Sequence, residues 1–187
     1  MLSPFNPKPR PCPVCRNSFV PIKPMQSVCG PRCAVKKVKQ AKVEERAQIK
    51  TRKEAIKRHP DLMKEAQEAF NGFIRERDKR RGCFVCGVPF PANRAGGAFD
   101  AGHVRSRGAA GHLRFNEDNC HGECKECNSP WGAKPHQIEA GAVARIGRER
   151  YEALAQDNSP VKWTRDQLRE IRDTYRAKTK ELKRGNP

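Results

Sequence analysis

The sequence lacks any long apolar run, and this absence excludes two classes of protein. No stretch is long and apolar enough for a membrane-spanning helix, and none forms the apolar core of a secretion signal. Apolar and aromatic residues make up only 36% of the chain, so a single large hydrophobic core is not expected. We therefore expect a cytoplasmic protein with no membrane partner, built from one or two small domains.

Acidic residues are also scarce compared with basic ones. The 187 residues include 39 Lys and Arg but only 21 Asp and Glu, which gives a formal net charge of +18 at pH 7. Such an excess is larger than solubility requires, and it indicates a polyanionic partner. Because no membrane segment is present, nucleic acid is favoured over a membrane surface.

Cysteine, by contrast, is abundant, and eight of the nine cysteines fall in close pairs. In a reducing compartment, paired thiols hold metal more often than they form disulfides. The two predicted sets of ligands are Cys12, Cys15, Cys29 and Cys33, and then Cys83, Cys86, Cys124 and Cys127. These spacings are typical of structural zinc, and the alternative is a set of unrelated buried thiols. Cys120 is left single and fits a small buried hydrophobe better than a nucleophile.

The remaining sequence predicts helices. Residues 34–58 contain no Gly or Pro and carry ten Lys or Arg against three Glu, which predicts a long solvated helix that either follows phosphates or is simply hydrated. Apolar residues at spacings of three and four predict an amphipathic helix over 61–79. Thr164 and Gln167 have the spacing of a capping box before a C-terminal helix.

These features divide the chain into five segments. Residues 1–11 are expected to be a flexible arm, 12–33 the first zinc module, and 34–81 the basic and amphipathic helices. Residues 82–134 hold the second zinc site, and 135–187 form C-terminal helices.

The segment from Cys83 to Lys134 contains the residues best suited to chemistry. Asp100-Ala-Gly-His103 is followed by Asn119, five positions before Cys124, and by Asn128, directly after Cys127. This order resembles the HNH, or His-Me finger, nucleases, in which a β-hairpin and a helix are joined at a metal-binding end. The resemblance implies an α+β protein with a small ββα-metal core, similar to a treble clef and stapled by zinc. Long helices and a separate N-terminal four-cysteine module would surround that core.

The wider chain resembles a narrower family, the NinG or Rap recombination endonucleases of lambdoid phages. The matching features are the N-terminal four-cysteine module, Phe73-Ile-Arg-Glu-Arg-Asp78, Asp100-Ala-Gly-His103, Leu113-Arg-Phe-Asn-Glu117, Cys-x2-Cys-Asn128 and Arg145-Ile-Gly147. This resemblance implies an endonuclease that cuts branched DNA, including Holliday junctions and D-loops, inside the bacterial host cell. The alternative is a zinc-containing DNA-binding or architectural protein without catalysis. RNA is a third candidate substrate.

Hydrolysis of a phosphodiester needs an activated water and stabilisation of the developing charge. His103 is the candidate general base because an imidazole titrates near neutral pH; the alternative is a structural histidine or an extra zinc ligand. Asn128 and Asp100 are the candidate ligands of a Mg²⁺ or Mn²⁺ ion, and His121 is the substitute. The HNH acid usually stands next to the His, but Asp100 is three residues away and would face the other side of a regular strand. A bulge at Gly102 could remove this conflict.

Other residues are expected to support this centre. Asn119 is predicted to tie its loop to the hairpin and help fix His103, with a simple turn Asn as the alternative. Three arginines, Arg105, Arg107 and Arg114, either hold phosphates or are solvated loop charges. We expect His59, His112 and His136 at the surface and Trp131 in the core rather than stacked on an unpaired base. A homodimer would supply the two coordinated cuts that a four-way junction requires.

Overall fold

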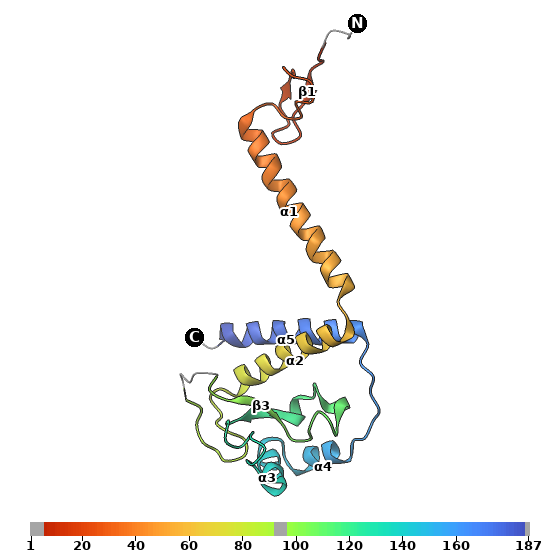
Figure 1. Ribbon diagram of the computed structural model, residues 1–187. Coiled ribbons are helices and arrows are strands. Elements are labelled where there is room, and N and C mark those ends of the chain that lie inside the picture. The colour runs from red at the N-terminus through yellow and green to blue at the C-terminus, as the bar shows by residue number, and fades with distance from the viewer. Residues whose placement is uncertain (1–5, 92–96, 186–187) are drawn as a thin grey trace. The chain divides into compact units, whose positions relative to one another are not determined.

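The computed structural model describes residues 6–91 and 97–185, and the chain divides into two units (Figure 1). The first is Met1–Lys57 and the second is Arg58–Pro187. The boundary falls between the two helices predicted within residues 34–81, so the basic helix belongs to the first unit and the amphipathic helix to the second.

The first unit consists of a short hairpin followed by a long helix. Strand β1 (Arg10–Pro11) pairs antiparallel with β2 (Ser18–Phe19), so Arg10 and Pro11 are not part of a flexible arm as predicted. Residues 1–5 of that predicted arm lie outside the described residues. Helix α1 (Pro31–Ile56) starts with a proline, whose missing N–H costs nothing in the first turn. No residue of α1 is buried, which confirms the predicted solvated helix.

Two helices hold the core of the second unit, α2 (His59–Asp78) and α5 (Arg165–Gly185). Their buried side chains form one cluster with two residues of the region between them: Leu62, Ala66, Phe70, Phe73, Ile74, Phe115, Cys120, Leu168 and Tyr175. The Tyr175 ring meets Phe70 edge-on with centroids 4.8 Å apart, and its hydroxyl donates to the Phe115 carbonyl. The apolar stripe predicted over 61–79 is therefore confirmed as core.

A two-stranded hairpin packs against α2. Strand β3 (Asp100–His103) runs antiparallel to β4 (Cys120–Glu123), with Asp100 opposite Glu123 and His103 opposite Cys120. The connection between them contains two 3-10 turns, η1 (Gly111–Leu113) and η2 (Glu117–Asn119). The pairing runs without interruption through Gly102, so the bulge expected at this glycine is absent. Helices with small sheets confirm the mixed class predicted from the sequence.

The remaining helices are α3 (Pro135–Ile146) and α4 (Arg148–Gln156). They are separated by Gly147, whose φ of 84° is easily reached only by glycine. Leu154 of α4 packs on Ala110 and Leu113 in a second apolar cluster. The capping box before α5 is confirmed, because the Thr164 and Gln167 side chains each accept from the other's backbone N–H. None of the helices within the described residues is long and apolar enough to cross a membrane.

The exposure predicted for two side chains, those of His112 and Trp131, is wrong. His112 is half-buried rather than at the surface, and its Nε2 lies 2.8 Å from the Asp157 carbonyl oxygen. Trp131 is 90% exposed rather than in the core. His59 and His136 are exposed, as predicted.

Candidate active site

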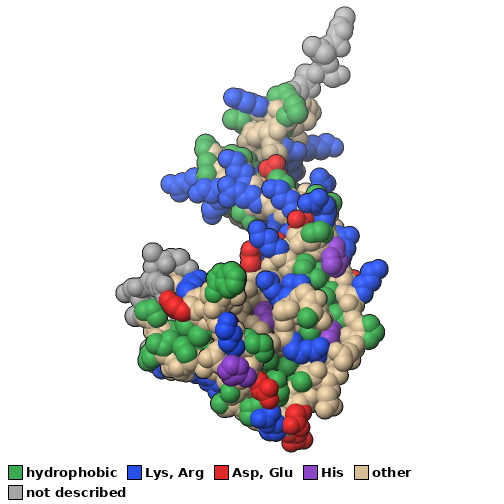
Figure 2. Space-filling view, turned by 60° about the horizontal axis from the view of Figure 1, so that its bottom comes forward, with side chains coloured by type: hydrophobic (Ala, Val, Ile, Leu, Met, Phe, Trp, Pro, Cys, Tyr) green, Lys and Arg blue, Asp and Glu red, His purple; other side chains and the backbone are tan. Residues whose placement is uncertain are grey.

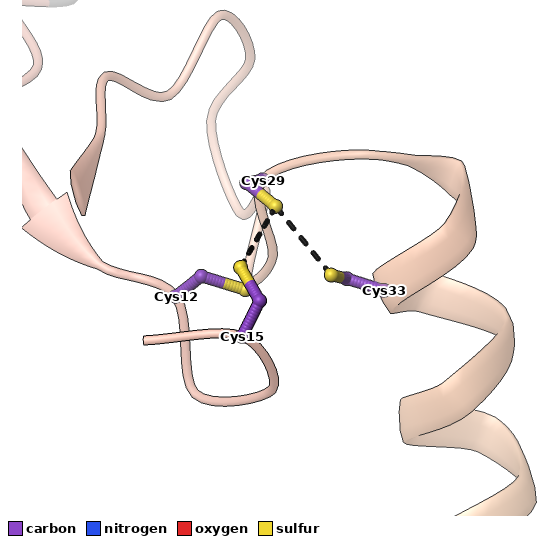
Figure 3. A group of neighbouring side chains, drawn as sticks. All are labelled: Cys12, Cys15, Cys29 and Cys33. Atoms are coloured by element: carbon purple, nitrogen blue, oxygen red, sulfur yellow. Dashed lines mark hydrogen bonds between the residues drawn. The ribbon is translucent and has the colours of Figure 1, made fainter. Parts of the chain in front are cut away.

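Both groups of four cysteines have the geometry of a zinc site. In each group the four Sγ atoms all lie within 4.8 Å of one another, and Figure 3 shows the first group, Cys12, Cys15, Cys29 and Cys33. Thiolates around one tetrahedral zinc, with Zn–S near 2.3 Å, are about 3.8 Å apart. Individual Sγ–Sγ distances are 3.5 Å for Cys15–Cys29 and, in the second group, 3.8 Å for Cys86–Cys124. Either group could therefore hold one zinc ion.

The second cysteine group, Cys83, Cys86, Cys124 and Cys127, joins the end of β4 to the segment before β3. The backbone N–H of Phe84 donates to the Gly122 carbonyl at 3.0 Å, which ties the first pair to β4. The Asn128 N–H donates to the Cys124 carbonyl, also at 3.0 Å. Asn128 is thus fixed in position by the turn that carries the last two cysteines.

A polar cavity of about 340 Å³ brings together four predicted site residues, namely the candidate catalytic residues Asp100, His103 and Asn128 and the candidate phosphate-binding Arg107. Its lining consists of Asn71, Arg75, Asp100, Ala101, His103, Ser106, Arg107 and Asn128. His103 and Asp100 come from the two ends of β3, and Asn128 comes from the cysteine turn. Asn71 and Arg75, on α2, were not among the predicted site residues; Arg75 stands in the Phe73–Asp78 segment that matches the family, but nothing local distinguishes Asn71 from other polar helix residues.

The hydrogen bonds of His103 determine which ring nitrogen is basic. Nε2 lies 3.1 Å from the Arg114 carbonyl oxygen, which can only accept, so Nε2 carries the proton. Nδ1 then has the lone pair, and it lies 3.7 Å from the Cys120 Sγ, a weak donor at most. Burial lowers the pKa of His103, and the positive charges of Arg107 and Arg114 lower it further. The ring is therefore neutral at pH 7.

Cys120, the first residue of β4, is fully buried. Burial raises the pKa of its thiol far above the usual value, so it stays protonated. This environment agrees with the interpretation of Cys120 as a small buried hydrophobe.

Asp100, which lines the cavity, is held by two neighbours. Its Oδ1 accepts from Lys125 Nζ at 2.7 Å, and its Oδ2 accepts from Asn128 Nδ2 at 3.3 Å. The side-chain oxygen and nitrogen of an amide are interchangeable by rotation, so Asn128 can also present its oxygen here. Carboxylate and amide oxygens are the ligands that Mg²⁺ and Mn²⁺ prefer.

Glu123 was not identified from the sequence; it is the neighbour of Asp100 across the hairpin and is not itself one of the residues that line the cavity. It lies opposite Asp100 in the hairpin and is only 4% exposed. Burial raises the pKa of Glu123 to about 7, and the negative charge of Asp100 raises it as well. A Cβ on Gly102 would collide with the Glu123 Oε2 and lie 2.9 Å from its Cβ. One feature of the sequence could have pointed to Glu123. Gly102 stands directly before His103, at the position where HNH nucleases usually have an acid.

Asn119 is completely buried and ties the connection to the end of β3. Its Oδ1 accepts from the Arg105 N–H at 2.8 Å, and its Nδ2 donates to the Arg105 and Leu113 carbonyls at 3.0 and 3.1 Å. Arg105 lies two residues after His103. Asn119 therefore positions this strand end and does not line the cavity.

The three predicted phosphate-binding arginines have different surroundings. The Arg105 guanidinium donates to the carbonyls of Leu154 and Asp157, at the end of α4. These hydrogen bonds use the donors that a phosphate would need. Arg114 donates to Gln67 at 3.1 Å and is half-buried. Arg107 is exposed and lines the cavity, as does Arg75. Arg107 and Arg75 are therefore the arginines placed to meet a ligand there.

His121, the substitute cation ligand, is not among the residues of this cavity. Its Nε2 lies 2.9 Å from the Asp118 carbonyl, and its Nδ1 lies 3.3 Å from Arg77 Nη2. Burial and the positive charge of Arg77 lower the pKa of His121 to about 4. It lines a different cavity, of about 600 Å³, together with Arg77, Arg145 and other residues.

Comparisons with known proteins point to one family. A family model described as "Bacteriophage Lambda NinG protein" matches residues 5–185. The chain is 32% identical to Protein ninG of Escherichia phage lambda over 190 residues, which cover 90% of each chain. It is 31% identical to Protein ninG of Escherichia phage 933W over 198 residues, covering 95% of each, and 31% identical to that of Salmonella phage P22 over 188 residues, covering 90% of each. No solved structure matches the chain.

Proposed function

Because this chain belongs to the NinG family of bacteriophage proteins, we propose that it is a metal-dependent endonuclease that cuts branched DNA. In this proposal, residues 82–134 form an HNH-like, treble-clef core stapled by zinc, and the phosphodiester is hydrolysed in the cavity beside β3. The observation that carries the proposal is the convergence of His103, Asp100 and Asn128 on one polar cavity. The preference for branched DNA rests on the resemblance of the sequence to the recombination endonucleases.

The donor atoms of the cavity fit a hard divalent cation. The Asp100 carboxylate and the Asn128 amide would hold Mg²⁺ or Mn²⁺, with water completing the coordination. Such an ion would withdraw charge from the scissile phosphate and the leaving oxygen. Lys125, which now neutralises Asp100, would have to give way or share the carboxylate.

His103 supplies the base. Its Nδ1 accepts a proton from a water molecule as the water oxygen forms a bond to phosphorus and the bond to the 3′ oxygen breaks. The Arg114 carbonyl holds the opposite nitrogen, which fixes the tautomer and stabilises the imidazolium that results. The lowered pKa of His103 keeps this base unprotonated at neutral pH.

Basic side chains are placed to hold the DNA backbone. Helix α1 carries nine Lys or Arg and three Glu, and its basic side chains stand out from the helix (Figure 2). In the second unit, Arg75 and Arg107 flank His103 in the cavity. Phosphate contacts of this kind give binding that weakens steeply with salt. A homodimer would supply a second active site for paired cuts across a four-way junction.

A cleavage assay tests this proposal directly. End-labelled linear duplex, flap, D-loop and four-way substrates are incubated with the zinc-loaded protein in Mg²⁺, in Mn²⁺ and in chelator. We expect cutting of the branched substrates only, and only with a divalent ion. Junction binding without cutting under every ion condition would instead favour the alternative, a zinc-containing architectural protein.

A further inference from the structure

The Glu123 side chain is almost entirely buried next to another acid, and its carboxylate has no protein partner among the described residues. Glu123 is 4% exposed, and no hydrogen bond to its carboxylate is found within the part of the chain that the structure describes. Asp100, directly opposite, is neutralised by Lys125, whereas no Lys or Arg among residues 6–91 and 97–185 forms an ion pair with Glu123. No buried side-chain oxygen within the described residues is without a partner, so the Glu123 carboxylate oxygens keep contact with solvent through the small exposed part of the side chain. A carboxylate in so enclosed a place, beside a second acid, is placed to take a cation as its counter-charge.

The position of this carboxylate is defined by Gly102. Alternation along β3 places Asp100 and Gly102 on one face, and Glu123 of β4 faces the same way because it pairs with Asp100. A side chain at position 102 would need the space that the Glu123 Oε2 occupies. The Glu123 carboxylate therefore occupies the space that a side chain at position 102, directly before His103, would otherwise fill.

From this geometry we propose that Glu123 is a ligand of the divalent cation, together with Asp100 and Asn128. The carboxylate reaches the position before His103 from the neighbouring strand, and the glycine is required there to admit it. Directly opposed residues in an antiparallel pair have Cβ atoms about 5 Å apart, so the two carboxylates can share one ion. Asn128, 3.3 Å from Asp100, completes a set of oxygen donors for Mg²⁺ or Mn²⁺. This inference extends the cation site of the proposed function.

The test measures Mn²⁺ binding to the zinc-loaded, full-length protein by electron paramagnetic resonance, without DNA. Glu123→Gln keeps the shape of the side chain but removes its charge, and we expect the dissociation constant for Mn²⁺ to rise by at least about tenfold. The matched control is Glu126→Gln, which removes one negative charge from an exposed position three residues away. The control is expected to bind Mn²⁺ like the wild type.

An exchange variant separates ligation from a structural role. Gly102→Asp combined with Glu123→Gly moves the carboxylate to β3 and the glycine to β4, which also removes the steric conflict. We expect this double variant to bind Mn²⁺ within about tenfold of the wild type, whereas Glu123→Gly alone binds weakly. Zinc content and thermal melting establish that each variant is folded.

Each outcome bears on a different claim. Unchanged Mn²⁺ affinity in Glu123→Gln, or a folded exchange variant that does not regain affinity, overturns the role of Glu123 and leaves the proposed nuclease function standing. Weakened affinity in Glu123→Gln, restored by the exchange, supports the site. If the wild type then cuts no DNA with any divalent ion, the nuclease function fails although the cation site stands.

Discussion

The side chain of Asn119 forms hydrogen bonds with both the backbone N–H and the backbone carbonyl of Arg105, at 2.8 and 3.0 Å. This pair joins the end of β3 to the connection that returns to β4. Because Asn119 is fully buried, its side-chain amide could not bind water instead if the pair were broken. The orientation of the strand that carries His103 therefore depends on a residue outside the cavity.

Asn119→Asp should destabilise the second unit. A carboxylate cannot donate to the carbonyls of Arg105 and Leu113, so the buried acceptors would face a negative charge, and we expect a loss of about 2–4 kcal/mol. Urea unfolding measures the loss. The control is Asn116→Ala, which removes an exposed cap of η2 and should cost about 1 kcal/mol. Equal losses in the two variants would contradict the role of the Asn119–Arg105 pair.

The pH dependence of cleavage should report on His103. The base works unprotonated, and burial together with Arg107 and Arg114 holds the pKa of His103 below its ordinary value of 6.5. Cleavage should consequently be lost only as the pH falls through this lowered pKa. Arg107→Ala removes a positive charge, so the pKa rises and the acid limb of the rate profile moves to higher pH.

The control for this shift is Arg80→Ala, which removes an exposed charge that is not among those acting on His103. Its profile should coincide with that of the wild type. NMR titration of the His103 ring without divalent ions gives the pKa independently of the rate. A pKa that stays unchanged, or falls, in Arg107→Ala would contradict this electrostatic account.

Removal of the two zinc sites should have separate effects, because they belong to different units. Cys12→Ser should lower the zinc content from two ions to one, weaken DNA binding and leave the melting of the second unit unchanged. Cys83→Ser should unfold the core that contains β3 and β4 and abolish cleavage. Zinc analysis with calorimetry checks both. Loss of both zinc ions in either single variant would show that the sites are not independent.

Trp131 gives a prediction about unpaired bases. Its ring is 90% exposed three residues after Asn128, whereas Trp163, the other tryptophan, packs on Phe115 with centroids 5.2 Å apart. If Trp131 stacks on an unpaired base at the branch, a junction should quench its fluorescence more than linear duplex does. Trp131→Phe leaves only the Trp163 signal and is the control. Quenching of equal size by both DNAs would exclude stacking at the branch.

The features that could be predicted from the sequence are local ones. The spacing of the cysteines predicted both four-cysteine groups that could hold a metal ion, because each close pair is brought together by a short turn. The apolar periodicity predicted α2, since helical spacing alone defines its buried face. Asp100, His103 and Asn128 line one cavity, and this grouping also depends on short segments. Asp100 and His103 are the two ends of a four-residue strand, and Asn128 follows the turn that carries the last two cysteines.

The features that were missed depend on contacts between distant segments. Glu123 reaches the position above Gly102 only through the register of β3 and β4, which no local pattern specifies. The Arg105 guanidinium donates to backbone carbonyls about fifty positions further along the chain, so it is not available for phosphate. Of the three predicted arginines, Arg107 is the exposed one. His121 does not line the cavity, because its ring is held by the Asp118 carbonyl and by Arg77 of α2.

The central claim is that His103 is the base of a DNA-cutting centre, and the most direct measurement compares His103→Ala with the wild type on a four-way junction. Binding is measured in Ca²⁺ or chelator and cleavage in Mg²⁺ or Mn²⁺, with the exposed His136→Ala as the control. We expect His103→Ala to bind the junction like the wild type but to cut it at least about 100-fold more slowly, whereas His136→Ala should bind and cut the junction like the wild type. Cleavage by folded His103→Ala at the wild-type rate would contradict this claim.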